Sequence, residues 1–246
     1  MNEFVHLFMA VLFVGWSAFI AVALIRFHRS RNPKADYTGV KSHASSHLEV
    51  GVVIVEAVLL LGFAFPFWKQ RVMEWPTGPD VVHVRAVGYQ FGWFFHYPGP
   101  DGQFGRVDPD FYATHPVALD MEDPGSKDDI VVPGTLTIPV NRPCVIDVTS
   151  KDVIHNLAIV PMRIAQDAFP GQEVPMWFTP TKKSVEGPWE IICGQLCGAG
   201  HSQMKGFIEV ISQEDWEKWL EERTPKPATP EAEVTVANAA GNPLEE

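Results

Sequence analysis

Two uninterrupted apolar runs in the first third of the chain constrain its fold more than any other feature. The run from Phe4 to Ile25 contains no Pro, Lys, Arg, Asp or Glu. As a helix it would be about 33 Å long, enough to cross the hydrocarbon core of a bilayer. A second run extends from Val50 to Trp68. The sequence therefore predicts a two-helix transmembrane hairpin in residues 1–72, with helices at about 4–26 and 48–68.

Basic residues gather in the loop between the two runs, and they orient the hairpin. Arg26, Arg29, Arg31, Lys34 and Lys41 all lie there, and short loops rich in Lys and Arg stay in the cytoplasm. A cleaved signal peptide is disfavoured, because the positive charge follows the first run rather than preceding it. We therefore expect a multi-pass protein of a bacterial-type plasma membrane, with everything after about residue 70 on the outer, periplasmic face.

Two acids accompany the second run, Glu49 at its cytoplasmic end and Glu56 inside it. A carboxylate within a membrane span is costly and points to a function. The alternative for Glu49 is a solvated carboxylate at the membrane interface. Glu56 needs a partner on a neighbouring helix, so we expect the hairpin to pack against another membrane protein.

Residues 80–212 change to the alternating pattern of β-strands. Several short strand-like runs are separated by turn residues, which predicts an all-β sandwich or barrel. Residues 98–129 are rich in Gly, Pro and Asp and are expected to form an irregular excursion. His96 and His115 flank this excursion without any ligand spacing, and we expect both at the surface.

The end of the chain combines a short helix with a tail. Ser212-Gln-Glu-Asp215 is a capping-box pattern that opens a helix at 213–223. Residues 224–246 lack periodicity and are predicted to be disordered. The formal net charge of −11 argues against a nucleic-acid partner. This charge fits either a cationic protein partner or simple solubility.

One stretch concentrates metal-ligand chemistry: Cys193-Gly-Gln-Leu-Cys197-Gly-Ala-Gly-His201-Ser-Gln-Met204. Thiolates and thioethers are soft ligands, and imidazole suits copper. A disulfide and a zinc site are the alternatives. A disulfide leaves His201 and Met204 without a role, and zinc has no use for a methionine, so copper is favoured. Two sulfurs on one loop can bridge two copper ions, and each ion then needs its own imidazole.

A second histidine is therefore required from elsewhere in the chain, and His155, just beyond a β-rich run, is the best candidate. The third cysteine, Cys144, lies in an apolar strand-like run. A lone cysteine there usually behaves as a small buried hydrophobic residue, and we assign it no role.

The pattern Cys-x-Gln-x-Cys-x-x-x-His-x-x-Met, preceded by Asp152-Val-Ile-His155, resembles subunit II of the haem-copper cytochrome c oxidases. The resemblance implies a two-helix transmembrane hairpin followed by a cupredoxin-like Greek-key domain with a binuclear copper centre, CuA. It implies a role for each residue of the pattern: Cys193 and Cys197 bridge two copper ions, His155 and His201 each bind one, and Met204 and the Gln195 backbone carbonyl complete the coordination.

The resemblance also implies partners and an activity. Single electrons would pass from a cytochrome c to the copper centre and on to haem in oxidase subunit I, among other oxidase subunits. Oxygen is reduced to water there, coupled to proton translocation, so this chain would be the subunit that receives electrons. Two rival functions are a membrane-anchored copper-delivery protein and a thiol-redox sensor.

Finer roles follow from the same resemblance. The family has Trp directly after Gln where electrons enter, but this chain has Phe91 there and Trp93 two places later, so both are candidates. Glu49 and Glu56 are candidates for a proton path. A magnesium ion at the subunit boundary uses a Glu side chain where this chain has Gln195, and a neutral amide binds a hard dication more weakly.

Overall fold

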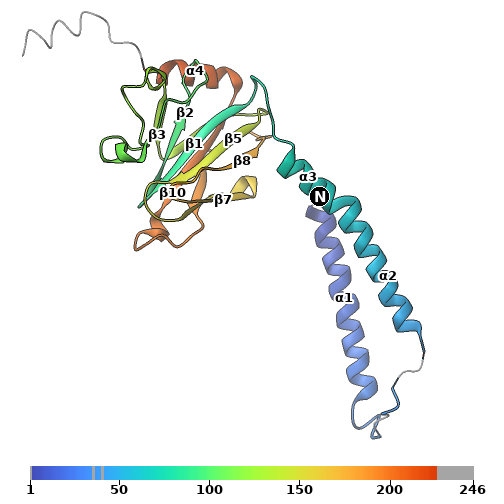
Figure 1. Ribbon diagram of the computed structural model, residues 1–246. Helices are drawn as coiled ribbons and strands as arrows, with labels where there is room; N and C mark the ends of the chain where they lie inside the picture. Colours follow the sequence, from blue (N-terminus) through green and yellow to red (C-terminus); the bar gives the residue numbers. More distant parts are fainter. Residues whose placement is uncertain (1, 35–36, 40–41, 226–246) are drawn as a thin grey trace, which may run out of the picture. The chain divides into compact units, whose positions relative to one another are not determined.

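The computed structural model describes residues 2–34, 37–39 and 42–225 (Figure 1). The chain divides into two units, Met1–Trp68 and Lys69–Glu246. Most of the tail predicted to be disordered, residues 226–246, lies outside the described residues, as does Lys41 of the basic loop.

The first unit is helical, and its apolar side chains are exposed along its length. Helix α1 covers Asn2–Phe27, and α2 covers Ala44–Leu59. A π-helical segment, Leu60–Ala64, joins α2 to α3 at Phe65–Met73. Pro66 lacks the N–H that would bond the carbonyl four residues earlier, and a wider turn before it accommodates that loss.

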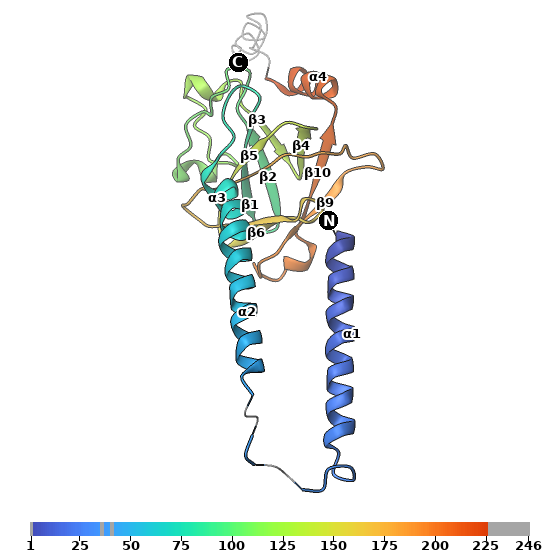
Figure 2. The ribbon, with the colours of Figure 1, turned by 90° about the vertical axis from the view of Figure 1, so that its right-hand side faces the viewer.

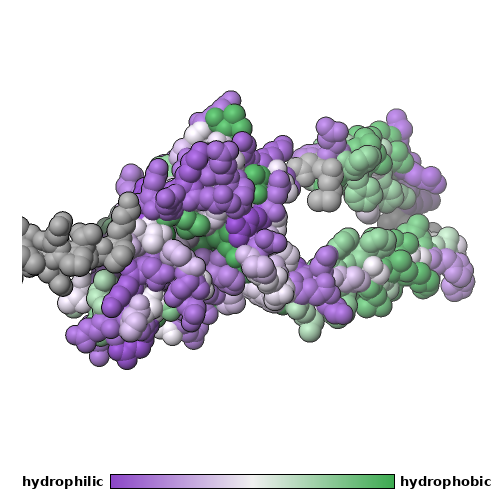
Figure 3. Space-filling view, turned by 90° about the horizontal axis from the view of Figure 1, so that it is seen from above, coloured by the Kyte–Doolittle hydropathy of each residue, from purple (hydrophilic) through white to green (hydrophobic). Residues whose placement is uncertain are grey.

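Both helical stretches, Glu3–Phe27 and Ala44–Met73, are long and apolar enough to cross a membrane. The second begins before residue 48 and ends after residue 68, so it exceeds the predicted helix at both ends. In Figure 3 the hydrophobic colour gathers on these helices, whereas the visible β surface is largely hydrophilic. Side chains this apolar need a surrounding other than water.

The second unit is a sandwich of two five-stranded sheets. One sheet has the order β3-β2-β1-β5-β8 and the other β4-β10-β9-β6-β7. The strands of the first sheet are β1 (Val82–Tyr89), β2 (Gly92–Tyr97), β3 (Ile130–Pro133), β5 (Cys144–Ser150) and β8 (Val174–Phe178). Those of the second are β4 (Thr135–Pro139), β6 (His155–Ile159), β7 (Ile164–Ala168), β9 (Trp189–Cys193) and β10 (Lys205–Ile211).

Neighbouring strands are antiparallel except for the pairs β1–β5 and β4–β10. In both sheets some neighbouring strands are distant in sequence, as β1 and β5 are, so the chain crosses from one sheet to the other between them. A Greek-key sandwich has such crossing connections. The expected fold class is confirmed: two apolar helices, a cupredoxin-like β domain and a short C-terminal helix. Alternate residues of each strand fill the space between the sheets, with Trp93, Phe95, Leu136, Ile146 and Ile208 fully buried.

The short helix and the cysteine-containing loop lie at opposite ends of the sandwich (Figures 1 and 2). Helix α4 covers Gln213–Arg223, and the side chain of Ser212 accepts a hydrogen bond from the Asp215 N–H, as the capping pattern predicts. Trp216 is buried beneath the helix, with its ring 6.0 Å from that of Tyr97. The loop after β9 therefore projects from an end that α4 does not cover.

The excursion at residues 98–129 contains only 3₁₀ turns and an isolated bridge, Val107↔Leu119. It covers one face of the first sheet, where Val117 and Leu119 pack with Val87 of β1.

The expectation that His96 lies at the surface is wrong. Its side chain is fully buried, because the pairing of β2 with β3 brings Asp129 beside it and Phe104 of the excursion covers the ring. The Nε2 atom lies 2.7 Å from Asp129 Oδ2. His115 is half-buried, and its Nδ1 accepts a hydrogen bond from the Leu119 N–H.

Candidate metal centre

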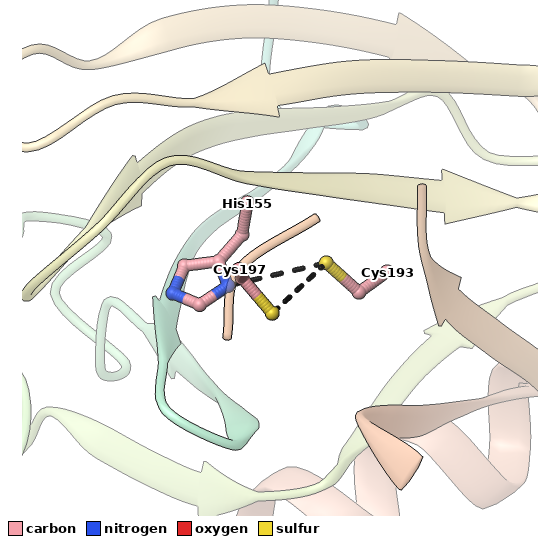
Figure 4. Close-up of side chains that lie close together, drawn as sticks. All are labelled: His155, Cys193 and Cys197. Carbon is pink, nitrogen blue, oxygen red and sulfur yellow. Dashed lines mark hydrogen bonds between the residues drawn. The ribbon is translucent and has the colours of Figure 1, made fainter. Parts of the chain in front are cut away.

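Two cysteine sulfurs face each other at the open end of the sandwich (Figure 4). Cys193 ends β9, and Cys197 follows on the loop; both side chains are buried. Their Sγ atoms are 3.9 Å apart. A disulfide would hold the sulfurs at about 2.05 Å, so both thiols are free.

His155 completes a compact group with these sulfurs. It begins β6, whose antiparallel pairing sets Leu157 opposite Cys193, so His155 lies beyond the end of β9 and beside the loop. His155 Nδ1 is 3.9 Å from Cys193 Sγ. The ligand atoms of His155, Cys193 and Cys197 all lie within 4.8 Å of one another.

The other three predicted ligands surround the same sulfurs. His201 Nδ1 is 3.6 Å and Met204 Sδ 3.7 Å from Cys197 Sγ. The Cys193 thiol donates to the Gln195 carbonyl over 3.2 Å. Residues from β6, from β9 and from the loop are thus brought together, although 38 positions separate His155 from Cys193.

The donor set fits copper. Two thiols, two imidazoles and a thioether form a soft set, and a buried thioether next to a thiol is of no use to zinc or magnesium. Four of the donor side chains are also shielded from bulk water, because Cys193, Cys197, Met204 and His155 are buried; His201 is partly exposed. The side chain of Gln195 is exposed and is not among these buried donors.

Asp152 orients the imidazole of His155. Its Oδ1 lies 2.8 Å from His155 Nε2, which leaves Nδ1 directed at the sulfurs. Its Oδ2 accepts a hydrogen bond from the Gln90 N–H over 2.8 Å. Burial alone would raise the pKa of Asp152, but the bonds from Gln90 and His155 outweigh it and the pKa is lowered. The carboxylate therefore stays ionised beside the ring.

The thiol of Cys197 is protonated in the metal-free protein. Burial and the neighbouring Cys193 thiol raise its pKa to about 11. Metal binding must displace this proton, because the thiolate is the ligand.

The structure separates the two aromatic residues considered for electron transfer. Trp93 is fully buried, with its ring 6.0 Å from that of His155. Phe91 is 40% exposed and covers the loop, since a Cβ on Gly200 would lie 2.5 Å from its ring. A docked protein can touch Phe91 but not Trp93. Glu49 and Glu56 are exposed on α2 in the other unit, and their roles stay predictions.

Sequence reasoning missed Gln90. Its side-chain amide donates to the Cys197 carbonyl over 2.7 Å. The residue sits in the turn between β1 and β2, 107 positions before Cys197. Nothing in the local sequence signals this contact, which depends on how the two sheets pack.

Comparisons with known proteins agree with the site. The model of the family "Cytochrome C oxidase subunit II, periplasmic domain" matches residues 82–211. The alternative cytochrome c oxidase subunit 2 of Bradyrhizobium diazoefficiens is 31% identical over 216 residues, covering 86% of this chain and 75% of that protein. Cytochrome c oxidase subunit 2 of Cereibacter sphaeroides is 29% identical over 238 residues, covering 90% and 74%.

Among solved structures, the periplasmic domain of subunit II of cytochrome oxidase from Bradyrhizobium japonicum is similar, with 26% identity and a TM-score of 0.43. The match covers 60% of this chain and 95% of that one. The family match spans most of the β domain and contains every residue of the cluster. This chain therefore belongs to the cytochrome c oxidase subunit II family.

Proposed function

We propose that this chain receives single electrons from a cytochrome c at a binuclear copper centre and passes them to haem in oxidase subunit I. One observation carries the proposal: two free, buried sulfurs lie 3.9 Å apart, each with an imidazole beside it. Membership in the subunit II family implies a copper centre, and the described donors match the softness that copper requires.

The chain's own residues would make electron transfer through such a centre fast. A bound copper pair supplies one-electron chemistry. His155 and Cys193 are fixed by paired strands, and Asp152 fixes the ring of His155, so the ligands need move little when charge arrives. Phe91 offers a surface contact next to the loop, and Trp93 lies buried beside His155. We propose Phe91 as the point where electrons enter and Trp93 as part of the packing around the histidine.

The remaining expectations belong to the same proposal. The two apolar helices would anchor the chain in a plasma membrane beside subunit I and other oxidase subunits, with the β domain in the periplasm. Glu49 and Glu56 would contribute to a proton path, in support of proton translocation by the oxidase. Gln195 would give its carbonyl to copper and would hold magnesium weakly. A thiol reagent that cannot cross the membrane, added from the periplasmic side, should fail to label a Ser45→Cys variant, whose new thiol lies in the first turn of α2; labelling there would reverse the orientation.

Electron paramagnetic resonance on the full chain, loaded with copper in detergent, tests the metal site. An electron shared by two copper nuclei gives a hyperfine pattern different from that of one nucleus, and metal analysis should find two copper ions per chain. A pattern from one nucleus would refute the binuclear site. A Cys144→Ala variant serves as the control, because Cys144 is buried in β5 and absent from the cluster; its spectrum should match that of the parent protein.

A further inference from the structure

An apolar groove lies beside helix α4, at the end of the β domain opposite the metal cluster (Figures 1 and 2). It encloses about 640 Å³, within the range that proteins use for bound ligands. Tyr97, the last residue of β2, and Trp216 of α4 line the groove and are almost fully buried, so their rings form its floor. The other lining residues are mostly apolar and include Leu220 of α4 and the prolines Pro79, Pro98 and Pro100.

A groove lined by aromatic rings is the kind of surface by which proteins recognise polyproline II helices. Segments with the pattern Pro-x-x-Pro dock in such grooves, because their extended shape exists before binding and little conformational entropy is lost. The groove beside α4 therefore has the lining for a proline-rich occupant.

The chain itself supplies such a segment at the edge of the groove. Pro225, at the end of the described residues, lines the groove together with Thr224. The sequence continues with Lys226-Pro-Ala-Thr-Pro230, in which Pro227 and Pro230 have the Pro-x-x-Pro spacing. Proline fixes φ near the value of the polyproline II helix. That helix has neither helical nor strand periodicity, so it agrees with the lack of periodicity in this part of the sequence.

Charge at the groove favours the same occupant. The Arg142 guanidinium lines the groove and bonds to three carbonyl oxygens, two of them of the backbone. It forms no ion pair with any residue that the structure describes, so its charge is free to attract a carboxylate. Glu231 and Glu233 come directly after the Pro-x-x-Pro segment. Glu221 of α4 also lines the groove, and Lys226 supplies the opposite charge.

We propose that residues 225–230 dock in this groove as a polyproline II segment, with the acids that follow them beside Arg142. The chain would then cover the apolar end of its own β domain. A segment tethered at the edge of its site competes at an effective concentration in the millimolar range, so weak contacts suffice to hold it there. The interaction requires no copper and lies away from the cluster, so it stands apart from the proposed function.

Competition with a free peptide tests the docking in the full chain in detergent. The probe is a fluorescein-labelled synthetic peptide of residues 225–236, and fluorescence anisotropy measures its binding. The parent chain is compared with a Pro227→Ala/Pro230→Ala double variant, whose changes lie outside every described element and leave the groove intact. Pro243→Ala is the matched control, because Pro243 belongs to the same tail but has no proline three positions away.

The double variant should bind the peptide about tenfold more tightly than the parent chain, because the parent's own segment competes at an effective concentration of about 1 mM. Pro243→Ala should bind it like the parent. A peptide in which both prolines are replaced by alanine should bind none of these chains. Equal affinity of the parent and the double variant for the proline peptide, including no binding to either, would overturn the proposal.

Two further measurements place the segment. Adding Arg142→Gln to the double variant should weaken peptide binding about threefold at low salt and less at high salt, as expected for an exposed ion pair. An unchanged affinity would put the peptide elsewhere and overturn the proposal. Analytical ultracentrifugation should find the same number of chains per particle in the parent and the double variant. A smaller particle in the double variant would show that the segment docks in a second copy, contrary to docking within one chain.

Discussion

Two buried histidine–aspartate pairs in the β domain look alike and do different things. His155 and His96 are both fully buried, and each places Nε2 within 2.8 Å of a carboxylate. The difference lies at the other ring nitrogen. Nδ1 of His155 faces Cys193 Sγ, whereas Nδ1 of His96 lies 3.2 Å from an Arg85 guanidinium nitrogen.

The surroundings of that second nitrogen decide which histidine can bind metal. An arginine is always charged and only donates hydrogen bonds, so it occupies the lone pair of His96 and repels a cation. Two sulfurs do the opposite for His155. The pair in the interior, His96–Asp129, thus ties β2 to the excursion, and the pair at the open end, His155–Asp152, prepares a ligand. A histidine–carboxylate pair alone does not identify a metal site.

Replacing Cys197 by serine should have the largest effect, because it removes one of the two sulfurs that distinguish the surroundings of His155 from those of His96. Electron transfer from cytochrome c through the assembled oxidase should fall by more than about a hundredfold, since even partners of metal ligands are worth 10–100-fold. Stopped-flow measurement of copper reduction provides the readout. Cys144→Ala should react at the parent rate. Parent-like turnover in Cys197→Ser would remove Cys197 from the electron path.

Asp129→Ala should affect folding and not the metal. It leaves the Nε2–H of His96 and the Gly105 N–H without their acceptor in a site that water does not reach. Leaving two buried donors without an acceptor costs about 3 kcal/mol. Urea unfolding of the full chain in detergent should show that loss, while the copper spectrum of the folded protein stays unchanged. An altered copper spectrum would show that the two histidine pairs are coupled.

Asp152→Asn should have the opposite profile. Asp152 accepts hydrogen bonds with both oxygens, and asparagine offers a single acceptor. His155 then loses its fixed orientation, and copper should be lost to a competing chelator about 10–100-fold more readily. The free energy of unfolding should change by only about 1 kcal/mol, because the Asp152 side chain is 31% exposed. Asp101→Asn, on the excursion, is the control and should retain copper like the parent chain.

The contrast also shows how far the sequence alone reaches. Cys193, Cys197, His201 and Met204 follow one another within a loop, so their spacing alone gathers them. The apolar runs and the capping residue Ser212 are equally local, and the structure agrees with each.

His96 and Gln90 could not be found in this way. His96 is buried because β2 pairs with β3 and because Phe104 covers it, and Gln90 meets Cys197 through packing between the two sheets. Such contacts depend on register and crossover, which local patterns do not encode.

The smallest expected effect is a pH dependence that belongs to the interior pair. Burial lowers the pKa of His96 below its usual value near 6.5, and the Arg85 charge acts in the same direction against the raising effect of Asp129. The folded chain therefore binds fewer protons than the unfolded chain just below pH 6.5. The contribution of neutral His96 to the free energy of unfolding is complete above that pH. It is lost as the pH falls toward the lowered pKa of His96, by at most about 1.4 kcal/mol per pH unit.

His96→Gln isolates this contribution, because glutamine can still donate to Asp129 and accept from Arg85 but cannot titrate. Between pH 7.5 and 5.5 the thermal midpoint of the parent chain should fall, and that of His96→Gln should fall less. His115, whose pKa burial also lowers, accounts for a remaining slope of the same sign. An unchanged slope in His96→Gln would mean that His96 titrates alike in the folded and unfolded chains, contrary to its burial and to an arginine at its Nδ1. The Arg85 guanidinium at Nδ1 would then not set His96 apart from His155.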